Sequence, residues 1–274
     1  MTRDGVIELP GAARLAFDDV GEGPAVVFVH PGLWDRRTWD DQMTTFPAAG
    51  FRAVRYDVRG YGGSSRQDGR RYSDVADLVA VLDALGIEHA ALVGCSMGGG
   101  ISIDTTLEHP ARVWALVPVA SAIGGVEPLQ EEDDWFTDVT APIDEAIGAG
   151  DLVRARTLEL ERIWATLGLE DHRGRRIRDI AFDNLHELTM DETLAEQLDP
   201  PASHRLHEID VPTLVLKADH DPAYSRRLSD MIAAGVVDAR EVTIEGADHV
   251  VNLRQPERFD AAVIPFLRDV APAD

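Results

Sequence analysis

The sequence predicts an α/β fold in which a mostly parallel sheet carries helices on both faces. Short apolar runs typical of buried strands alternate with amphipathic patterns typical of helices, from residue 25 to 120 and again from 213 to 270. Such alternation is characteristic of parallel sheets whose crossovers are helical. A stretch without a convincing strand, about 124–205, interrupts the alternation. We therefore expect an all-helical segment inserted between two strands of one sheet.

The elements can be placed in order from these patterns. Expected strands cover residues 5–9, 12–18, 25–29, 52–57, 90–93, 113–120, 213–217 and 241–244. Pro10-Gly11 separates the first two strands and favours an opening hairpin. Expected helices cover residues 38–49, 73–85, about 97–107, 142–167, 177–198, 223–234 and 256–270. In the clearest of these helices, Ser73 can cap the start and Gly86 can end it.

The bulk composition bounds the class of protein and its partners. A chain of 274 residues with no apolar run of membrane-spanning length, no apolar leader at its start and one cysteine predicts a cytoplasmic protein without disulfides. Its net charge of −23 makes nucleic acid and anionic membranes poor partners, and it disfavours strongly anionic substrates. We expect a small-molecule substrate and neither a metal nor a cofactor. The sequence leaves the formation of a homodimer open.

The rest of the chain is organised around the sequence Gly94-Cys95-Ser96-Met97-Gly98. It follows a buried strand and precedes a helix pattern, which is the context of a G-x-S-x-G nucleophile elbow. The glycines leave room for neighbouring backbone, and the serine at the turn is held in a strained conformation at a helix N-terminus. The N-terminus of a helix stabilises the negative charge that develops when such a serine attacks a substrate, so Ser96 is the predicted nucleophile.

A serine hydroxyl needs a base, and the base needs an orienting carboxylate. In elbow enzymes the acid and then the histidine follow the serine along the chain, on loops after later strands. His249 is the only histidine after the last expected strand, and it is the predicted base. Asp219 and Asp221 both follow strand 213–217; we prefer Asp221, which can also cap the next helix.

An acyl-transfer enzyme also needs donors for the oxyanion. The amide of Met97 directly follows the nucleophile and is one expected donor. The second should come from the loop after strand 25–29, where Gly32 is the first choice and Leu33 the second.

Taken together, these residues resemble the serine-nucleophile branch of the α/β-hydrolase fold superfamily, with enol-lactonase-like or carboxylesterase-like cores. The resemblance extends over nearly the whole chain and rests on the motifs HPG (30–32), DVRGYGGSS (57–65), GCSMGG (94–99), DHDP (219–222), GADH (246–249) and QPERF (255–259). It implies an eight-stranded sheet with a helical cap inserted after the sixth strand. It also implies the triad Ser96, Asp221 and His249, and no cofactor. The chain departs from the family pattern at Pro31, where glycine is usual, and at Asp248, which adds a carboxylate beside the base.

The resemblance implies a core formed by residues 1–123 and 206–274 and a cap, or lid, formed by residues 124–205. The leading hypothesis is a serine hydrolase that cleaves a small-molecule ester or lactone through an acyl-enzyme on Ser96. Alternatives with the same triad are a carbon–carbon bond hydrolase, a perhydrolase, a lyase and a non-catalytic ligand receptor, because a fold alone does not determine function. The candidate substrate-pocket walls are Leu33, Trp34, Trp135, Phe136 and Trp164, although the aromatic residues could equally pack the cap onto the core.

Overall fold

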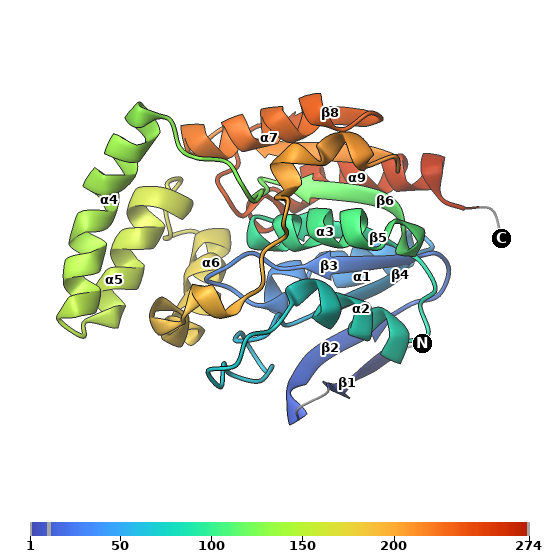
Figure 1. Ribbon diagram of the computed structural model, residues 1–274, viewed down its shortest axis with the longest axis horizontal. Helices are drawn as coiled ribbons and strands as arrows, with labels where there is room; N and C mark the ends of the chain where they lie inside the picture. Colours follow the sequence, from blue (N-terminus) through green and yellow to red (C-terminus); the bar gives the residue numbers. More distant parts are fainter. Residues whose placement is uncertain (1, 10–11, 273–274) are drawn as a thin grey trace.

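The computed structural model describes residues 2–9 and 12–272, and its centre is an eight-stranded sheet (Figure 1). The strand order is β1-β2-β4-β3-β5-β6-β7-β8. The strands are β1 (Thr2–Glu8), β2 (Arg14–Val20), β3 (Ala25–Val29), β4 (Arg52–Tyr56), β5 (Ala90–Cys95), β6 (Val113–Val119), β7 (Thr213–Ala218) and β8 (Ala239–Ile244). Only β2 runs against its neighbours, and every other pairing in the sheet is parallel. The predicted fold class is confirmed, although the expected Pro10-Gly11 turn lies outside the described residues.

Helices cover both faces of the sheet, as Figure 1 shows. One face packs against α2 (Asp74–Ala84), α3 (Met97–Glu108) and α7 (Ala223–Gly235). The other face packs against α1 (Gln42–Ala48) and α9 (Pro256–Val270), and the short α8 (Val251–Arg254) precedes α9. The central strands are therefore buried on both sides, which explains why they appear in the sequence as continuous apolar runs.

The predicted capping of α2 is borne out in detail. Ser73 accepts a hydrogen bond from the Ala76 amide at 3.2 Å, and Gly86 adopts a positive φ of 64° just beyond the helix end. The expected helix over 38–49 is divided. It begins as a 3-10 turn at Arg36–Trp39 and continues as α1 from Gln42.

Between β6 and β7 the chain forms helices and turns, among them α4 (Gln130–Gly148), α5 (Leu152–Glu159) and α6 (His172–Asp183). Figure 1 places these helices at one end of the molecule, away from both termini. The predicted helix 142–167 is wrong, because α4 runs through Pro142 and the chain turns at Gly150, which has a φ of 76°. The predicted helix 177–198 is also wrong. Helix α6 starts earlier, where the Asp171 side chain caps the Gly174 amide, and it ends at Asp183.

The helices between β6 and β7 are docked onto the core by specific contacts. Leu129 at the start of α4 donates its amide to Glu132, and Glu132 forms an ion pair of 2.6 Å with Arg227 on α7. The division of the chain into a core and a cap of residues 124–205 stays a prediction. None of the helices formed by residues 2–9 and 12–272 is long and apolar enough to cross a membrane.

Candidate active site

Ser96 occupies a strained turn between β5 and α3. Its φ of 51° and ψ of −117° are rarely adopted by a residue with a side chain, and such strain commonly marks functional positions. The turn has no space for a side chain on either flanking glycine. A methyl group on Gly94 would lie 2.1 Å from the Gly98 carbonyl oxygen, and one on Gly98 would lie 2.2 Å from the Val29 carbonyl oxygen. The sequence therefore produces the elbow geometry that its G-x-S-x-G pattern predicts.

Asp221 and His249 form a direct contact in the loops that follow β7 and β8. Asp221 Oδ1 lies 2.8 Å from His249 Nδ1, and both side chains are buried. With Nδ1 donating to the carboxylate, Nε2 of the imidazole is left to accept a proton.

Asp219, the other acid that the sequence offered, has a different role. Its two carboxylate oxygens accept the amides of Gly246 and Ala247 at 3.0 and 3.1 Å, which holds the turn before His249. Burial alone would raise the pKa of Asp219, but these two amide hydrogen bonds outweigh it and lower the pKa. The structure thus separates an acid that contacts the imidazole from an acid that shapes the loop.

The elbow and the Asp221–His249 pair lie at the same edge of the sheet. Strands β5, β6, β7 and β8 are parallel neighbours, so the loops after their carboxyl ends converge. The Cys95 thiol contacts the His249 carbonyl oxygen at 3.5 Å, which places His249 beside the residue that precedes Ser96. Burial raises the pKa of the Cys95 thiol, so this cysteine stays protonated and is not suited to be a nucleophile.

His30 stabilises the loop that would complete an oxyanion site. Its Nε2 accepts the Val58 amide at 2.9 Å, and its Nδ1 donates to the Pro31 carbonyl at 2.8 Å, an arrangement that requires the neutral ring. Complete burial lowers the pKa of His30, in agreement with this assignment. His30 therefore connects the loop after β3 to the loop after β4.

A cavity of about 450 Å³ opens above the elbow and contains Ser96 together with all three oxyanion-site candidates, Gly32, Leu33 and Met97. Leu33 has a φ of +70°, an unusual value that marks this loop as constrained. The remaining walls come from the loop after β4, the start of α2, the first turns of α3, the residues after β6 and the segment 187–197. The sequence patterns did not single out the start of α2 or the segment 187–197, because polar residues at a helix start and on a connection are ordinary there.

Among the predicted pocket walls, only Leu33 lines this cavity. Trp34 is fully buried, and its indole donates to the Ile177 carbonyl on α6 at 2.8 Å. Phe136 packs edge-on against Trp135 and against Tyr224 of α7, with ring centroids 4.9 and 5.4 Å apart. Trp34 and Phe136 therefore join the helices between β6 and β7 to the core, whereas Trp135 is exposed and packs against Phe136 of its own helix.

Trp164 occupies a separate position over the histidine. It ends a π-helical turn, Leu160–Trp164, and its ring lies 4.3 Å from the His249 ring at an angle of 38°. π-Helical turns often occur at functional sites, and this one holds an indole ring against the imidazole. Trp164 thus covers His249 rather than lining the cavity around Ser96.

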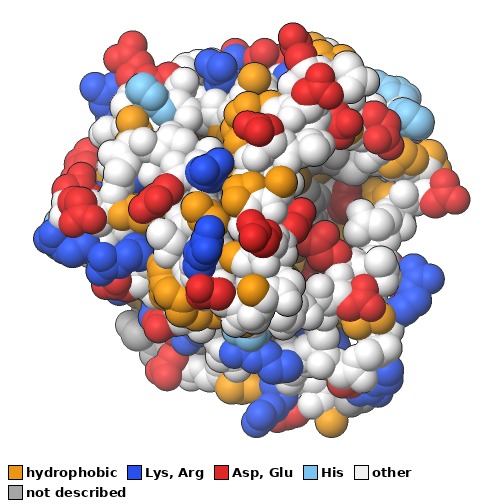
Figure 2. Space-filling view, turned by 90° about the vertical axis from the view of Figure 1, so that its left-hand side faces the viewer, with side chains coloured by type: hydrophobic (Ala, Val, Ile, Leu, Met, Phe, Trp, Pro, Cys, Tyr) orange, Lys and Arg blue, Asp and Glu red, His pale blue; other side chains and the backbone are white. Residues whose placement is uncertain are grey.

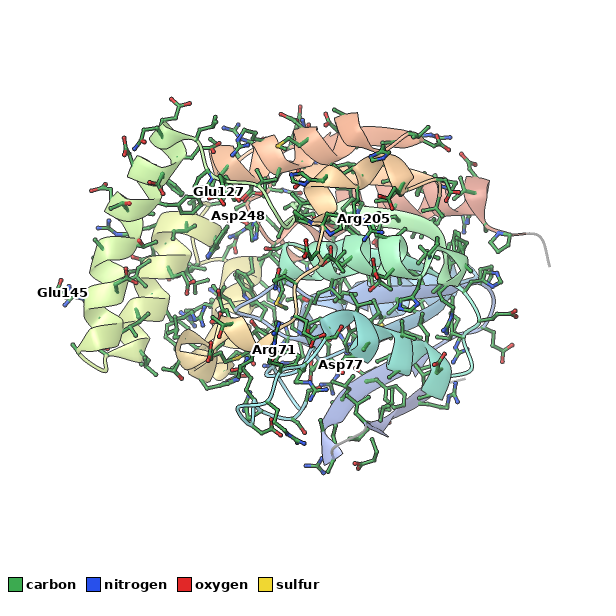
Figure 3. All side chains as sticks on the ribbon, viewed as in Figure 1. Arg71, Asp77, Glu127, Glu145, Arg205 and Asp248 are labelled. Atoms are coloured by element: carbon green, nitrogen blue, oxygen red, sulfur yellow. The ribbon has the colours of Figure 1, made fainter. Side chains whose placement is uncertain are left out.

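Asp248, the departure from the family pattern, is neutralised within the protein. Arg254 donates to both of its carboxylate oxygens, at 3.1 and 2.6 Å, and the Leu167 amide contacts one of them at 3.3 Å. Figure 3 shows Asp248 between the core and the helices of the segment between β6 and β7. The extra carboxylate therefore forms a buried ion pair at the junction of these parts.

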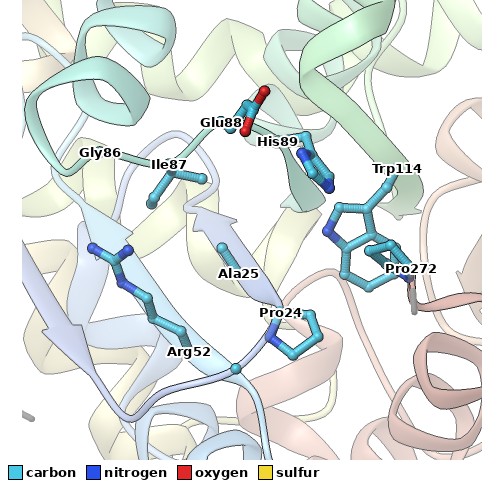
Figure 4. Close-up of a pocket in the computed structure, with 10 residues that line it drawn as sticks. Pro24, Ala25, Arg52, Gly86, Ile87, Glu88, His89, Trp114 and Pro272 are labelled. Carbon is cyan, nitrogen blue, oxygen red and sulfur yellow. The ribbon is translucent and has the colours of Figure 1, made fainter. Parts of the chain in front are cut away.

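A second cavity, of about 320 Å³, lies at the opposite end of the sheet (Figure 4). It is lined by residues at or just before the starts of β3, β4, β5 and β6, among them Pro24, Arg52, His89 and Trp114. Ligands of parallel α/β sheets bind outside the carboxyl ends of the strands, and this cavity is at the other end. The cavity that contains Ser96 is therefore the candidate active site.

Comparison with known proteins agrees with this geometry. The sequence profile of the alpha/beta hydrolase family matches residues 26–262. The chain is 29% identical over 265 residues to the putative non-heme bromoperoxidase BpoC of Mycobacterium tuberculosis, a match that covers 94% of this chain and 98% of that protein. It is 25% identical over 263 residues to 3-oxoadipate enol-lactonase 1 of Acinetobacter baylyi, with 90% of each protein covered.

Two further matches extend the comparison. Polyketide synthase ThaQ of Burkholderia thailandensis is 31% identical in an alignment 278 positions long that covers 96% of this chain but only 12% of that protein. Among solved structures, a thermophilic esterase from Thermogutta terrifontis superposes with a TM-score of 0.81 at 23% identity, covering 98% of this chain and 100% of that chain. At this identity the superposition shows the shared fold.

The chain therefore belongs to the alpha/beta hydrolase family. Its relatives are named as enzymes, and the chain is an alpha/beta hydrolase enzyme.

Proposed function

We propose that this enzyme is a serine hydrolase that cleaves a small-molecule carboxylic ester or lactone. The observation that carries the proposal is that a strained elbow serine in a cavity wall and a buried, hydrogen-bonded aspartate–histidine pair lie in loops at the same edge of the sheet. A serine hydroxyl becomes nucleophilic when a neutral imidazole can accept its proton.

In the proposed reaction, Ser96 Oγ attacks the carbonyl carbon while His249 Nε2 takes the hydroxyl proton. The carbonyl π-electrons move to oxygen, and the amides of Met97 and of Gly32 or Leu33 stabilise the resulting oxyanion. When the tetrahedral intermediate collapses, the alkoxide leaves with the proton held by His249. Water then attacks the acyl-enzyme by the same route and releases the acid and free Ser96.

Asp221 holds the imidazole in the tautomer that this scheme requires. Its carboxylate accepts a hydrogen bond from the Nδ1–H group, with Oδ1 2.8 Å from Nδ1, and it stabilises the positive charge that His249 gains during each step. We further propose that residues 124–205 form a lid, since Trp164 from this segment lies against the His249 ring.

The experiment measures hydrolysis of p-nitrophenyl esters and of a small lactone by the wild-type enzyme, by Ser96→Ala and by the matched control Cys95→Ser. We expect Ser96→Ala to lose at least about a thousandfold in kcat and Cys95→Ser to retain turnover. Unchanged turnover in Ser96→Ala would refute the proposal. Hydrolysis of vinylogous diketones but not of esters would assign the triad to carbon–carbon bond cleavage, and ligand-induced thermal shifts without any turnover would indicate a receptor.

A further inference from the structure

The cavity that contains Ser96 is strongly acidic. Five carboxylates and one guanidinium line it: Asp74, Asp104, Glu187, Glu192, Glu196 and Arg59. They come from α2, α3, the segment 187–197 and the loop after β4, so the acidic character is shared by several walls rather than by one helix. Figure 2 shows acidic side chains spread over the end of the molecule that carries α4 and α5, several of them around a hollow.

The single guanidinium does not compensate the carboxylates. Arg59 donates from Nε and Nη2 to the two oxygens of Asp77, at 2.9 and 2.8 Å, and Asp77 lies on α2 (Figure 3) outside the cavity lining. One of the five carboxylates is likewise engaged, since Glu187 pairs with the buried Arg156 at 2.5 Å. The charges that remain without a counterion are therefore negative.

Of the four lining carboxylates that remain without an ion pair, Glu192 and Glu196 are exposed, whereas Asp74 and Asp104 are half-buried in the cavity wall. Within the part of the chain that the structure describes, neither accepts a hydrogen bond, and Asp74 Oδ1 is buried without a partner. Burial, together with the charge of Asp77 near Asp74 and of Glu108 near Asp104, raises the pKa of each carboxyl to about 7, although the more distant charges of Arg59 and Arg205 act in the opposite direction. Leaving a buried acceptor such as Asp74 Oδ1 unsatisfied is costly, and a ligand that supplies positive charge would satisfy it, with Asp104 close enough to influence the same charge.

The other lining residues favour an organic cation over a metal ion. Tyr61 and Tyr72 also line the cavity, and the Tyr72 ring already has the Arg59 guanidinium 5.0 Å from its centroid. Ammonium groups bind well where aromatic faces and carboxylates meet. Among the described residues, no group of three or more His, Cys, Asp or Glu side chains is arranged to hold a metal ion. A volume of about 450 Å³ is sufficient for a small ester.

We propose that the preferred ester or lactone carries an ammonium group, which Asp74 and Asp104 bind inside the cavity beside Ser96. Glu192 and Glu196 are exposed at the rim, where with the net charge of −23 they attract cations toward the cavity. This inference rests on the proposed hydrolase function and specifies its substrate class.

The test compares pairs of esters that differ only in charge. In the first pair, choline butyrate is compared with the analogue in which a tert-butyl group of nearly the same shape replaces the trimethylammonium group of the alcohol. In the second pair, the same replacement is made at the end of the acyl chain of a p-nitrophenyl ester. We expect kcat/KM to favour the cationic member of at least one pair by about tenfold, the scale of one desolvated cation contact. Asp74→Asn/Asp104→Asn should reduce this ratio to near one, whereas the exposed control Asp138→Asn on α4 should leave it unchanged.

Binding is measured separately from turnover so that the two proposals can fail independently. Tetraethylammonium should raise the Tm of the wild type and of Ser96→Ala relative to sodium chloride at equal ionic strength, and should not raise that of the double variant. If neutral esters are hydrolysed but the cationic esters are not preferred and tetraethylammonium does not raise the Tm, the cation-site inference is overturned and the hydrolase proposal stands. A shift without any ester turnover would support the cation site and contradict the hydrolase.

Discussion

Asp221 Oδ1 lies 2.8 Å from His249 Nδ1, and the acid two residues earlier, Asp219, instead accepts the amides of Gly246 and Ala247. The two acids follow the same strand but have separable roles. One orients the imidazole, and the other shapes the loop that carries it.

This separation gives the first prediction. Asp221→Asn should lower kcat by about a thousandfold to ten-thousandfold, because an amide can donate to Nδ1 and so stabilise the wrong histidine tautomer. Asp219→Asn should lower kcat less than tenfold, as an amide oxygen can still accept at least one of the two backbone amides. Ester turnover with matched circular dichroism spectra checks both. Equal losses in the two variants would contradict the assignment.

The elbow glycines yield a prediction about stability. Gly98→Ala would place a methyl group 2.2 Å from the Val29 carbonyl oxygen, and backbone cannot move aside cheaply. We expect the free energy of unfolding to fall by about 2–3 kcal/mol. Gly100→Ala on the same helix is the control: its methyl group meets the Ala122 carbonyl oxygen at 3.5 Å, an ordinary contact. It should be neutral or stabilising by up to about 1 kcal/mol in urea unfolding. A stable Gly98→Ala would refute this account of the turn.

The buried ion pair between Asp248 and Arg254 should also contribute to the free energy of unfolding. Asp248→Asn leaves the Arg254 guanidinium buried without its close bidentate partner, since Asp171 lies 3.8 Å away. Removing one partner of such a pair typically costs about 3–5 kcal/mol. Urea unfolding of Asp248→Asn, Arg254→Met and the double variant should show a double-variant loss smaller than the sum of the single losses. Additive losses would mean that the two residues do not depend on each other.

A pH dependence follows from Asp104, whose neighbours include Glu108, Arg205 and Asp74. Its pKa is raised from 3.8 to about 7, so the folded protein holds this proton more tightly than the unfolded chain does. The contribution of Asp104 to stability therefore falls as pH rises from about 4 to 7 and is constant above that.

Asp104→Asn should accordingly raise the Tm at about pH 8.5 by about 2–4 °C, corresponding to ~1 kcal/mol, and the gain should vanish near pH 4. Asp138→Asn, at an exposed site on α4, controls for the loss of one negative charge. A gain that is independent of pH, or equal in the two variants, would contradict the raised pKa.

The sequence predicted the sheet well because each central strand is buried on both faces and appears as an uninterrupted apolar run, such as Ala25–Val29. It also predicted the elbow, since Gly94 and Gly98 are required by backbone contacts that hold wherever this turn occurs. The pairing of Asp221 with His249 followed from their order after successive strands, and the preference for Asp221 over Asp219 agrees with the contact in the structure. The helix-capping role expected of Asp221 was wrong, because the N-cap of α7 is Pro222 and no side chain caps it.

The helices between β6 and β7 were placed poorly for identifiable reasons. Pro142 favoured a helix start, but α4 continues through it. The better signals were Gly150, which turns the chain, and Asp151, whose side chain caps the Arg154 amide. The acidic walls of the cavity could not be predicted, because Asp74 and Asp104 come together from two helices, and neither helix carries a pattern that indicates a site.

The central claim is that Ser96 is the nucleophile, and labelling by a fluorophosphonate tests it most directly. The wild-type protein and Cys95→Ser should each gain one phosphonyl group, mapped by peptide mass spectrometry to residue 96, and Ser96→Ala should gain none. Absence of an adduct on the folded wild type, or an adduct on any other residue, would contradict the account.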